Sequence, residues 1–182
     1  NQSRRQRQMC IRDSYSSISH MGFALAGLAV GTNEGIQSSL IYISIYLLMN
    51  LAFFSCLFML KRNDIYYEDL SDLSGLSKNH PILALCLLIS LFSLAGIPPL
   101  AGFFAKFYIF LAVIKEEMYF LAIVGLLSTV VAAFYYLRVI KTIYFDSQTE
   151  KFDINHDIGL KISLLVSTVI ILIYFIYPSP LQ

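Results

Sequence analysis

Lys106 is the only charged residue in the apolar run from Pro81 to Ile114. The helix-breaking residues just before it are Gly96, Pro98, Pro99 and Gly102. Proline lacks a backbone N–H and clashes with the preceding turn, so we do not expect a continuous helix through residues 95–102. In lipid, a broken backbone is tolerated only where protein or water satisfies the freed polar groups. We therefore predict a functional site at this break, with Lys106 as its ionisable group.

A lysine in such a run has two interpretations. If Lys106 lies near a helix end, its amine can extend to the membrane interface. If it lies in the interior, burial disfavours the charged amine, which can then exchange protons near neutral pH. We favour a proton or ion pathway, because charges inside membranes usually serve function.

Weaker candidates lie on two earlier segments. His20 follows three serines and titrates near neutrality, so it is either a proton relay or a helix-packing histidine. Tyr42, Tyr46 and Asn50 recur every four residues, which places them on one face of a helix. Hydrogen bonds that hold helices together are the simpler interpretation of this polar stripe, and a water-lined path is the alternative.

The composition predicts a membrane protein. Of the 182 residues, 57% are hydrophobic and only 14% are charged, against about 25% charged in soluble domains. We predict an all-α polytopic transmembrane bundle. Cys10, Cys56 and Cys86 are scattered, and we find no metal-binding spacing, catalytic triad or phosphate-binding loop. The expected helices cover about residues 14–30, 39–60, 81–114 (broken at 95–102), 119–145 and 158–177.

The charges indicate an orientation. Five spans with alternating loops place all 13 Lys and Arg except Lys106 and Lys115 on one side or at the adjoining span ends. Cytoplasmic loops carry such an excess, so we expect residues 1–14, 61–80 and 146–157 to be cytoplasmic and the C-terminus to be outside. Tyr135 and Tyr136 precede Arg138, a pattern typical of an interfacial belt.

Several motifs resemble one family, the subunit N group of the antiporter-like membrane subunits of NADH-quinone oxidoreductase (respiratory complex I). The central motif is LAGIPP followed by GFFAKFY, in which Ala105 stands where the family usually has glycine. The matching segments are Ser14–Phe23 (SYSSISHMGF), Leu48–Phe53 (LMNLAF), Leu94–Tyr108, Tyr135–Val139 (YYLRV) and Pro178–Leu181 (PSPL).

The resemblance implies a fold of fourteen transmembrane helices with two inverted five-helix repeats, each with one broken helix. Residues 14–182 would be the last five helices of that proton-translocating domain, and Lys106 would be the lysine of the second broken helix. Residues 1–13 do not match the family pattern. We therefore expect a non-matching basic lead-in there, of foreign or misread sequence, and a missing upstream part.

The resemblance also implies a function. The chain would translocate protons, coupled to electron transfer from NADH to quinone elsewhere in a hetero-oligomeric complex of the bacterial inner membrane, rather than the mitochondrial one. Its partners would be the other membrane subunits and the lipid bilayer, with no nucleic acid. This chain would hold no cofactor, whereas other subunits would use NADH, FMN, iron–sulfur clusters and quinone. The alternative is a subunit of a Mrp-type cation/proton antiporter or of a related hydrogenase-type complex.

Overall fold

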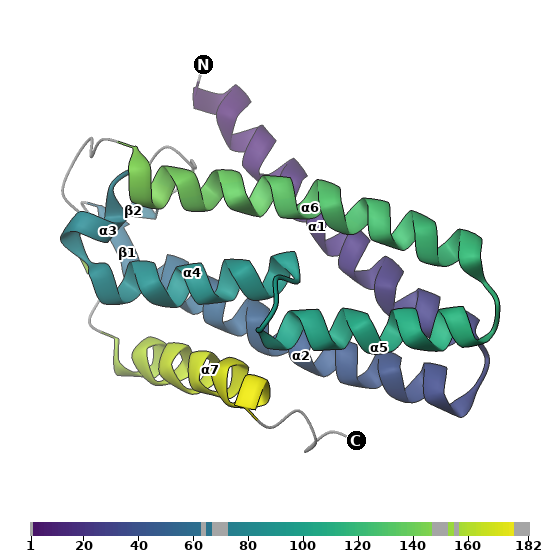
Figure 1. Ribbon diagram of the computed structural model, residues 1–182. Helices are drawn as coiled ribbons and strands as arrows, with labels where there is room; N and C mark the ends of the chain where they lie inside the picture. Colours follow the sequence, from purple (N-terminus) through teal and green to yellow (C-terminus); the bar gives the residue numbers. More distant parts are fainter. Residues whose placement is uncertain (1, 63–64, 67–72, 147–152, 155–156, 177–182) are drawn as a thin grey trace.

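The computed structural model describes residues 2–62, 65–66, 73–146, 153–154 and 157–176. These residues form an elongated bundle of helices with short strands at one end (Figure 1). The all-α transmembrane class predicted from the sequence is confirmed, and the strands are only two or three residues long. The elements are α1 (Gln2–Ala29), α2 (Asn33–Met59), β1 (Leu60–Arg62), β2 (Ile65–Tyr66), α3 (Leu76–Asn79), α4 (Pro81–Ala95), α5 (Ala101–Lys115), α6 (Tyr119–Phe145), β3 (Asp153–Ile154) and α7 (Ile158–Ile176).

Helix α2 is the centre of the bundle and contacts α1, α4, α5 and α7. Tyr42, Met49 and Ala52 on this helix are almost completely buried. Among helices in lipid, association depends on close packing and on hydrogen bonds rather than on hydrophobicity. Small and polar residues on α2 serve this purpose: the hydroxyl of Ser39 donates to the carbonyl of Ala24 on α1 at 2.8 Å.

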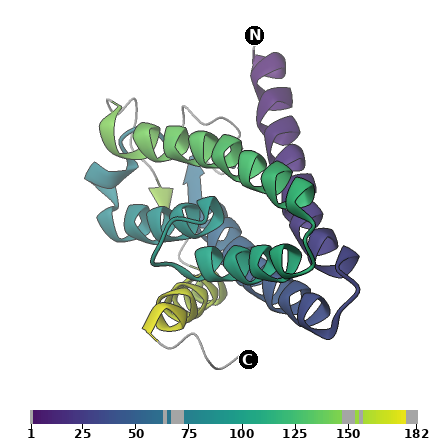
Figure 2. The same ribbon diagram turned by 45° about the vertical axis from the view of Figure 1, so that its right-hand side comes forward.

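The first two helices are longer than the sequence patterns predict. Helix α1 runs from Gln2 through the polar lead-in to Ala29, and its N-terminal part extends away from the bundle (Figure 2). Helix α2 begins at Asn33, six residues before the expected start at Ser39. The side chain of Thr32 accepts a hydrogen bond from the Gly35 N–H at 3.2 Å and so caps α2 at this earlier point.

Helix α6 presents a mostly apolar surface to the outside. Phe120 is 82% exposed, and Val131 and Phe134 are each 73% exposed. Helices α2 and α6 are long and apolar enough to cross a membrane, each with 27 residues. An uncovered apolar helix of this length suits contact with lipid or with another membrane helix.

Three strands connect the two polar loops at one end of the bundle. They form a small antiparallel sheet in the order β2-β1-β3, in which Lys61 pairs with Tyr66 and also with Asp153. The segments after α2 and after α6 therefore lie side by side. At the other end, the Lys115 amine forms an ion pair with the Glu34 carboxylate at 2.6 Å.

Candidate functional site

The predicted break lies between α4 and α5, at residues 96–100. Helix α4 ends because Gly96 adopts a left-handed conformation with φ of +79°. The Gly96 N–H donates to the carbonyl of Ser93, and the Ile97 N–H donates to the carbonyl of Phe92. This pair of hydrogen bonds is a Schellman-type helix ending. Residues 96–100 then connect the two helices, and α5 begins at Ala101 (Figure 1). Pro98 and Pro99 thus lie in the break, whereas Gly102 lies in the first turn of α5.

Lys106 points back from the second turn of α5 to the end of α4. Its side chain is only 4% exposed, and its Nζ donates to the carbonyl oxygens of Leu94 at 3.1 Å and of Ala95 at 3.3 Å. The last carbonyls of a helix have no intrahelical partner and carry its partial negative charge. Among the described residues, the structure records no carboxylate paired with Lys106. The broken helix therefore supplies the polar partners of this buried amine.

Two glycines make this arrangement possible. A Cβ atom on Gly96 would lie 3.1 Å from Cδ and 3.2 Å from Nζ of Lys106. At Gly102, a Cβ atom would overlap the carbonyl oxygen of Ser93, so the backbones of α4 and α5 can meet only without a side chain there. The Oγ of Ser93 accepts a hydrogen bond from the Gly102 N–H at 3.0 Å and lies 2.9 Å from the Met49 Sδ.

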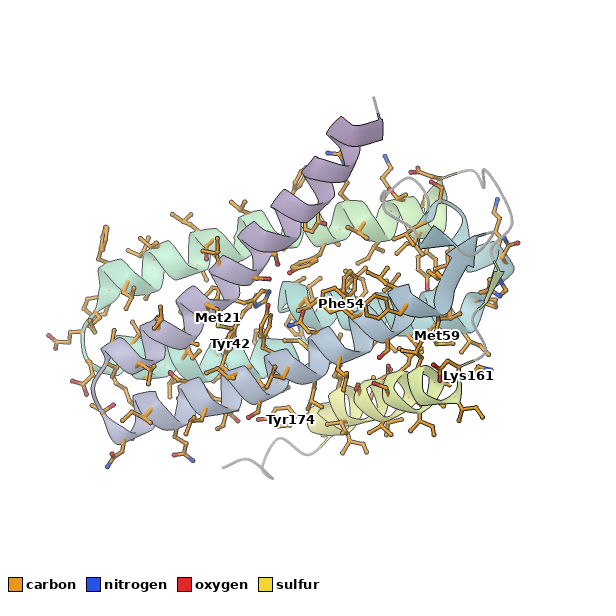
Figure 3. All side chains as sticks on the ribbon, turned by 180° about the vertical axis from the view of Figure 1, so that it is seen from behind. Met21, Tyr42, Phe54, Met59, Lys161 and Tyr174 are labelled. Atoms are coloured by element: carbon orange, nitrogen blue, oxygen red, sulfur yellow. The ribbon has the colours of Figure 1, made fainter. Side chains whose placement is uncertain are left out.

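His20 is the centre of a hydrogen-bonded chain between three helices. Its Nδ1 lies 2.6 Å from the Tyr42 hydroxyl on α2, and its Nε2 lies 3.1 Å from the Tyr136 hydroxyl on α6. The Tyr136 hydroxyl also bonds to the Ser16 hydroxyl. Figure 3 shows Tyr42 between α1 and α2. Because imidazole and hydroxyl groups can both donate and accept, this chain is able to pass a proton along its length.

Phe23 lies between Lys106 and this chain. The Lys106 Nζ is 5.3 Å from the centre of the Phe23 ring, a cation–π distance. The Phe23 ring in turn lies 5.9 Å from the ring of Tyr42. Among the described residues, no hydrogen bond joins Lys106 to His20. The two predicted ionisable groups are therefore connected through the rings of Phe23 and Tyr42.

The predicted polar stripe on α2 lies beside the hydrogen-bonded chain of His20. Tyr42 bonds to His20, and the Tyr46 ring stacks on the imidazole at 4.7 Å between ring centres. Asn50 donates to the Tyr46 carbonyl at 3.0 Å. Tyr46 and Asn50 also line a cavity of about 40 Å³ together with Ser16 and Ser17. A water molecule needs about 10–15 Å³ on the same measure, so this cavity has room for water beside the few polar groups of a largely apolar lining.

The sequence interpretation missed three residues of the site. Tyr136 was assigned to an interfacial belt, and that assignment is wrong, because its side chain is 4% exposed and bonds to His20. Ser93 and Phe23 were not singled out. The signal for Ser93 was a hydroxyl three residues before the helix-breaking Gly96. No simple pattern marks Phe23, whose position depends on how α1 packs against α5.

The described residues show no group of three or more His, Cys, Asp or Glu that could hold a metal ion. Cys56 and Cys86 are buried free thiols in this part of the chain. The chemical groups that the site brings together are an amine, an imidazole and hydroxyls. Such groups exchange protons without a bound cofactor.

The fold and the site define a class: polytopic helical membrane proteins in which a helix is broken at mid-length beside a buried lysine. The chain belongs to the family described as NADH:quinone oxidoreductase/Mrp antiporter, TM. The family model matches residues 6–132, so the match includes residues 6–13 of the basic lead-in.

A similar protein is NADH-quinone oxidoreductase subunit N of Pelagibacter ubique. It is 74% identical over 168 residues, which cover 92% of this chain and 36% of that protein. The chain thus spans about a third of the length of the relatives that it matches.

Solved structures share the fold. Respiratory complex I from Thermus thermophilus with bound NADH contains a chain that matches with a TM-score of 0.66 and 24% identity, over 91% of this chain and 35% of that one. The Mrp complex from a Dietzia species contains a chain that matches with a TM-score of 0.76 and 19% identity, over 89% of this chain and 38% of that one. At these identities, the likeness extends to the fold alone.

Proposed function

We propose that this chain is the second-repeat, proton-translocating part of a complex I membrane subunit of the subunit N type. The observation that carries the proposal is the position of Lys106, a buried amine bonded to the carbonyls of Leu94 and Ala95 at the end of a broken helix. Polar groups buried within a membrane are costly and are retained mainly where they serve transport.

The proton would be held in turn by Lys106 and by the His20 chain. Lysine can release its proton, unlike arginine, and the carbonyls of α4 keep its amine in place. His20 receives or passes a proton through the hydroxyls of Tyr42 and Tyr136. The step past Phe23 needs a rotation of the lysine side chain or an inserted water molecule. The cavity lined by Ser16, Asn50 and Tyr136 has room for water on the Tyr136 side of the hydrogen-bonded chain.

The orientation follows from the charges and from the two ends of the bundle. The sheet that pairs Lys61 with Asp153 supports a common side for the loops after α2 and α6. The ion pair of Glu34 with Lys115 supports a common, opposite side for the α1–α2 and α5–α6 turns. The side that holds the loops after α2 and α6 carries the excess of Lys and Arg, so in this proposal it is the cytoplasmic side of a bacterial inner membrane. The C-terminal end of α7 then faces the opposite side.

In this proposal the chain works within a hetero-oligomer. Its partners are the other membrane subunits and the lipid. NADH, FMN, iron–sulfur clusters and quinone belong to other subunits and none to this chain. The fold likeness to a Mrp complex fits a cation/proton antiporter equally well, but the 74% identity to a subunit N favours complex I.

The test is substitution of Lys106 in the assembled complex. Lys106→Ala removes the titratable group, and Lys106→Arg keeps a charge that cannot be released. Both variants should lose most proton pumping while the complex still assembles. The measurements are proton uptake and NADH oxidation in membrane vesicles, with assembly followed on native gels. Normal pumping by the assembled alanine variant would show that Lys106 is only structural.

A further inference from the structure

A cavity of about 410 Å³ lies between α1, α5 and α6, and Phe23 forms part of its wall. Apart from Ser19 and Ser128, every lining residue is a glycine or an apolar residue. The Ser128 hydroxyl already donates to the carbonyl of Gly125 at 2.8 Å. The cavity is therefore suited to an apolar group rather than to a polar ligand.

The Phe23 ring occupies the position between Lys106 and the hydrogen-bonded chain of His20. Phe23 is only 5% exposed. The Lys106 Nζ lies 5.3 Å from the centre of its ring, and the ring of Tyr42, whose hydroxyl bonds to His20, lies 5.9 Å from it on the other side of the contact. A phenyl ring has no group that donates or accepts a proton. In this position the ring keeps the amine apart from the proton-exchanging groups of the chain.

The cavity gives this ring a second place to lie. A phenylalanine in a helix can adopt more than one χ1 rotamer. A cavity of about 150 Å³ with apolar walls is enough to hold a benzene molecule, and this one measures about 410 Å³. The Phe110 ring lines the same cavity and packs edge-on against Phe23, with 5.9 Å between ring centres. The second position is therefore apolar and large enough for the ring.

Gly125 on α6 keeps the wall of the cavity clear of both rings. A Cβ atom at this position would lie 3.0 Å from Cε1 of Phe110 and 3.4 Å from Cε1 of Phe23. The first of these distances is closer than ordinary van der Waals contact, so a side chain at residue 125 would press on the Phe110 ring. The glycine thus leaves the two rings free to shift.

The charge of Lys106 favours the present position of the ring. A positive amine near the face of an aromatic ring is attracted by the negative potential of that face. A neutral amine has no such attraction. The ring is therefore held against Lys106 while the lysine carries its proton, and it is released when the proton is lost.

We propose that Phe23 is a charge-sensitive gate between Lys106 and the His20 chain. When Lys106 is neutral, the ring turns into the cavity and water enters the space that it leaves. Tyr42 then passes a proton through this water to the lone pair of the amine, and His20 replaces the proton of Tyr42. The charged amine attracts the ring again, which stops the proton from returning. This inference rests on the proposed function, because it requires Lys106 to carry protons.

The experiment compares variants of the assembled complex in membrane vesicles by two readouts. These are the number of protons taken up per NADH oxidised and the rate at which the pH gradient collapses once NADH is exhausted. Phe23→Ala removes the ring and should lower the first value. The collapse should become about tenfold faster, the change in rate that corresponds to the loss of a buried cation–π contact. Phe23→Leu keeps an apolar side chain without the aromatic face, and it should show the same two changes.

A control separates the gate from simple packing. Phe104→Ala removes another partly buried ring, which packs against Tyr174 at 6.3 Å between ring centres. This variant should keep the wild-type number of protons per NADH and the wild-type rate of collapse. Unchanged values in both Phe23 variants, or equal changes in Phe104→Ala, would overturn the gate.

A second pair of variants tests the cavity. Ala26→Leu fills the space beside Phe23 without touching the ring in its present position, so the open position becomes overpacked. Proton uptake should slow about tenfold while the gradient still collapses slowly. Ala29→Leu adds the same side chain at the exposed end of α1, away from the cavity, and should take up protons normally. Normal uptake in Ala26→Leu would overturn the gate.

The Lys106→Ala variant distinguishes the two proposals. Normal pumping in that variant would overturn the proposed function, and with it the gate. Loss of pumping in Lys106→Ala together with wild-type behaviour of the Phe23 and Ala26 variants would overturn the gate alone.

Discussion

The Oγ of Ser93, in the last turn of α4, lies 3.0 Å from the N–H of Gly102, in the first turn of α5, and accepts its hydrogen bond. A helix start has N–H groups without intrahelical partners, and here the preceding half-helix provides one of the acceptors. This contact holds the two halves of the broken helix together. It also sets the distance between the carbonyls of α4 and Lys106.

The first prediction concerns Gly102. Gly102→Ala should destabilise the subunit by about 1–3 kcal/mol, because the new Cβ would overlap the Ser93 carbonyl and force α4 and α5 apart. The measurement is the midpoint of thermal unfolding of the purified complex. Gly22→Ala is the matched control, since a Cβ there meets no atom within 4 Å. Equal midpoints for the two variants would contradict the close approach of α4 and α5.

The second prediction concerns Ser93. Ser93→Ala leaves the buried Gly102 N–H without an acceptor, at a cost of about 1–3 kcal/mol. Because Lys106 bonds to Leu94 and Ala95, the residues directly after Ser93, we also expect slower proton pumping in the assembled complex. Ser44→Ala removes an exposed hydroxyl that bonds only within α2, and it should change neither stability nor pumping. Stability loss with unchanged pumping would limit Ser93 to a structural role.

The third prediction tests the relay. Tyr136→Phe removes the hydroxyl between His20 and Ser16 and leaves the ring in place. If the lost hydrogen bond raises the transfer barrier by about 1.4 kcal/mol, proton translocation should slow about tenfold. Tyr144→Phe on the same helix is the control and should pump normally. The readout is the rate of NADH-driven proton uptake in vesicles, per assembled complex. Similar rates in both variants would exclude Tyr136 from the pathway.

The fourth prediction tests the orientation. A cysteine in place of Ser77, in α3, should resist a membrane-impermeant thiol reagent added to intact cells, because we place it in the cytoplasm. A cysteine in place of the exposed Glu116, at the opposite end of the bundle, should react under the same conditions. Cys10, Cys56 and Cys86 are first replaced by serine or alanine. Reversed labelling would invert the proposed topology.

The helical character and the place of the break were predictable from local chemistry. Pro98 and Pro99 would break the interior of a continuous helix, and a glycine directly after α4 suits a left-handed ending. The helix starts were less predictable. The cap at Thr32 begins α2 six residues before the expected position, and α1 continues through the polar lead-in. The prediction placed helix starts by hydropathy, and a single capping hydrogen bond at a polar residue does not change the hydropathy of the segment.

Residue types and their spacing were enough to show that Lys106 is the one strong charge in its apolar run and that a helix break lies beside it, because both depend on a single segment. The contacts of these residues depend on how the helices pack. His20, Tyr42 and Tyr136 come from three helices, and their hydroxyl–imidazole chain depends on the rotation of each helix about its axis. That rotation results from packing between distant segments, which no local pattern encodes. For the same reason, the sequence could not show that Phe23 lies against the Lys106 amine.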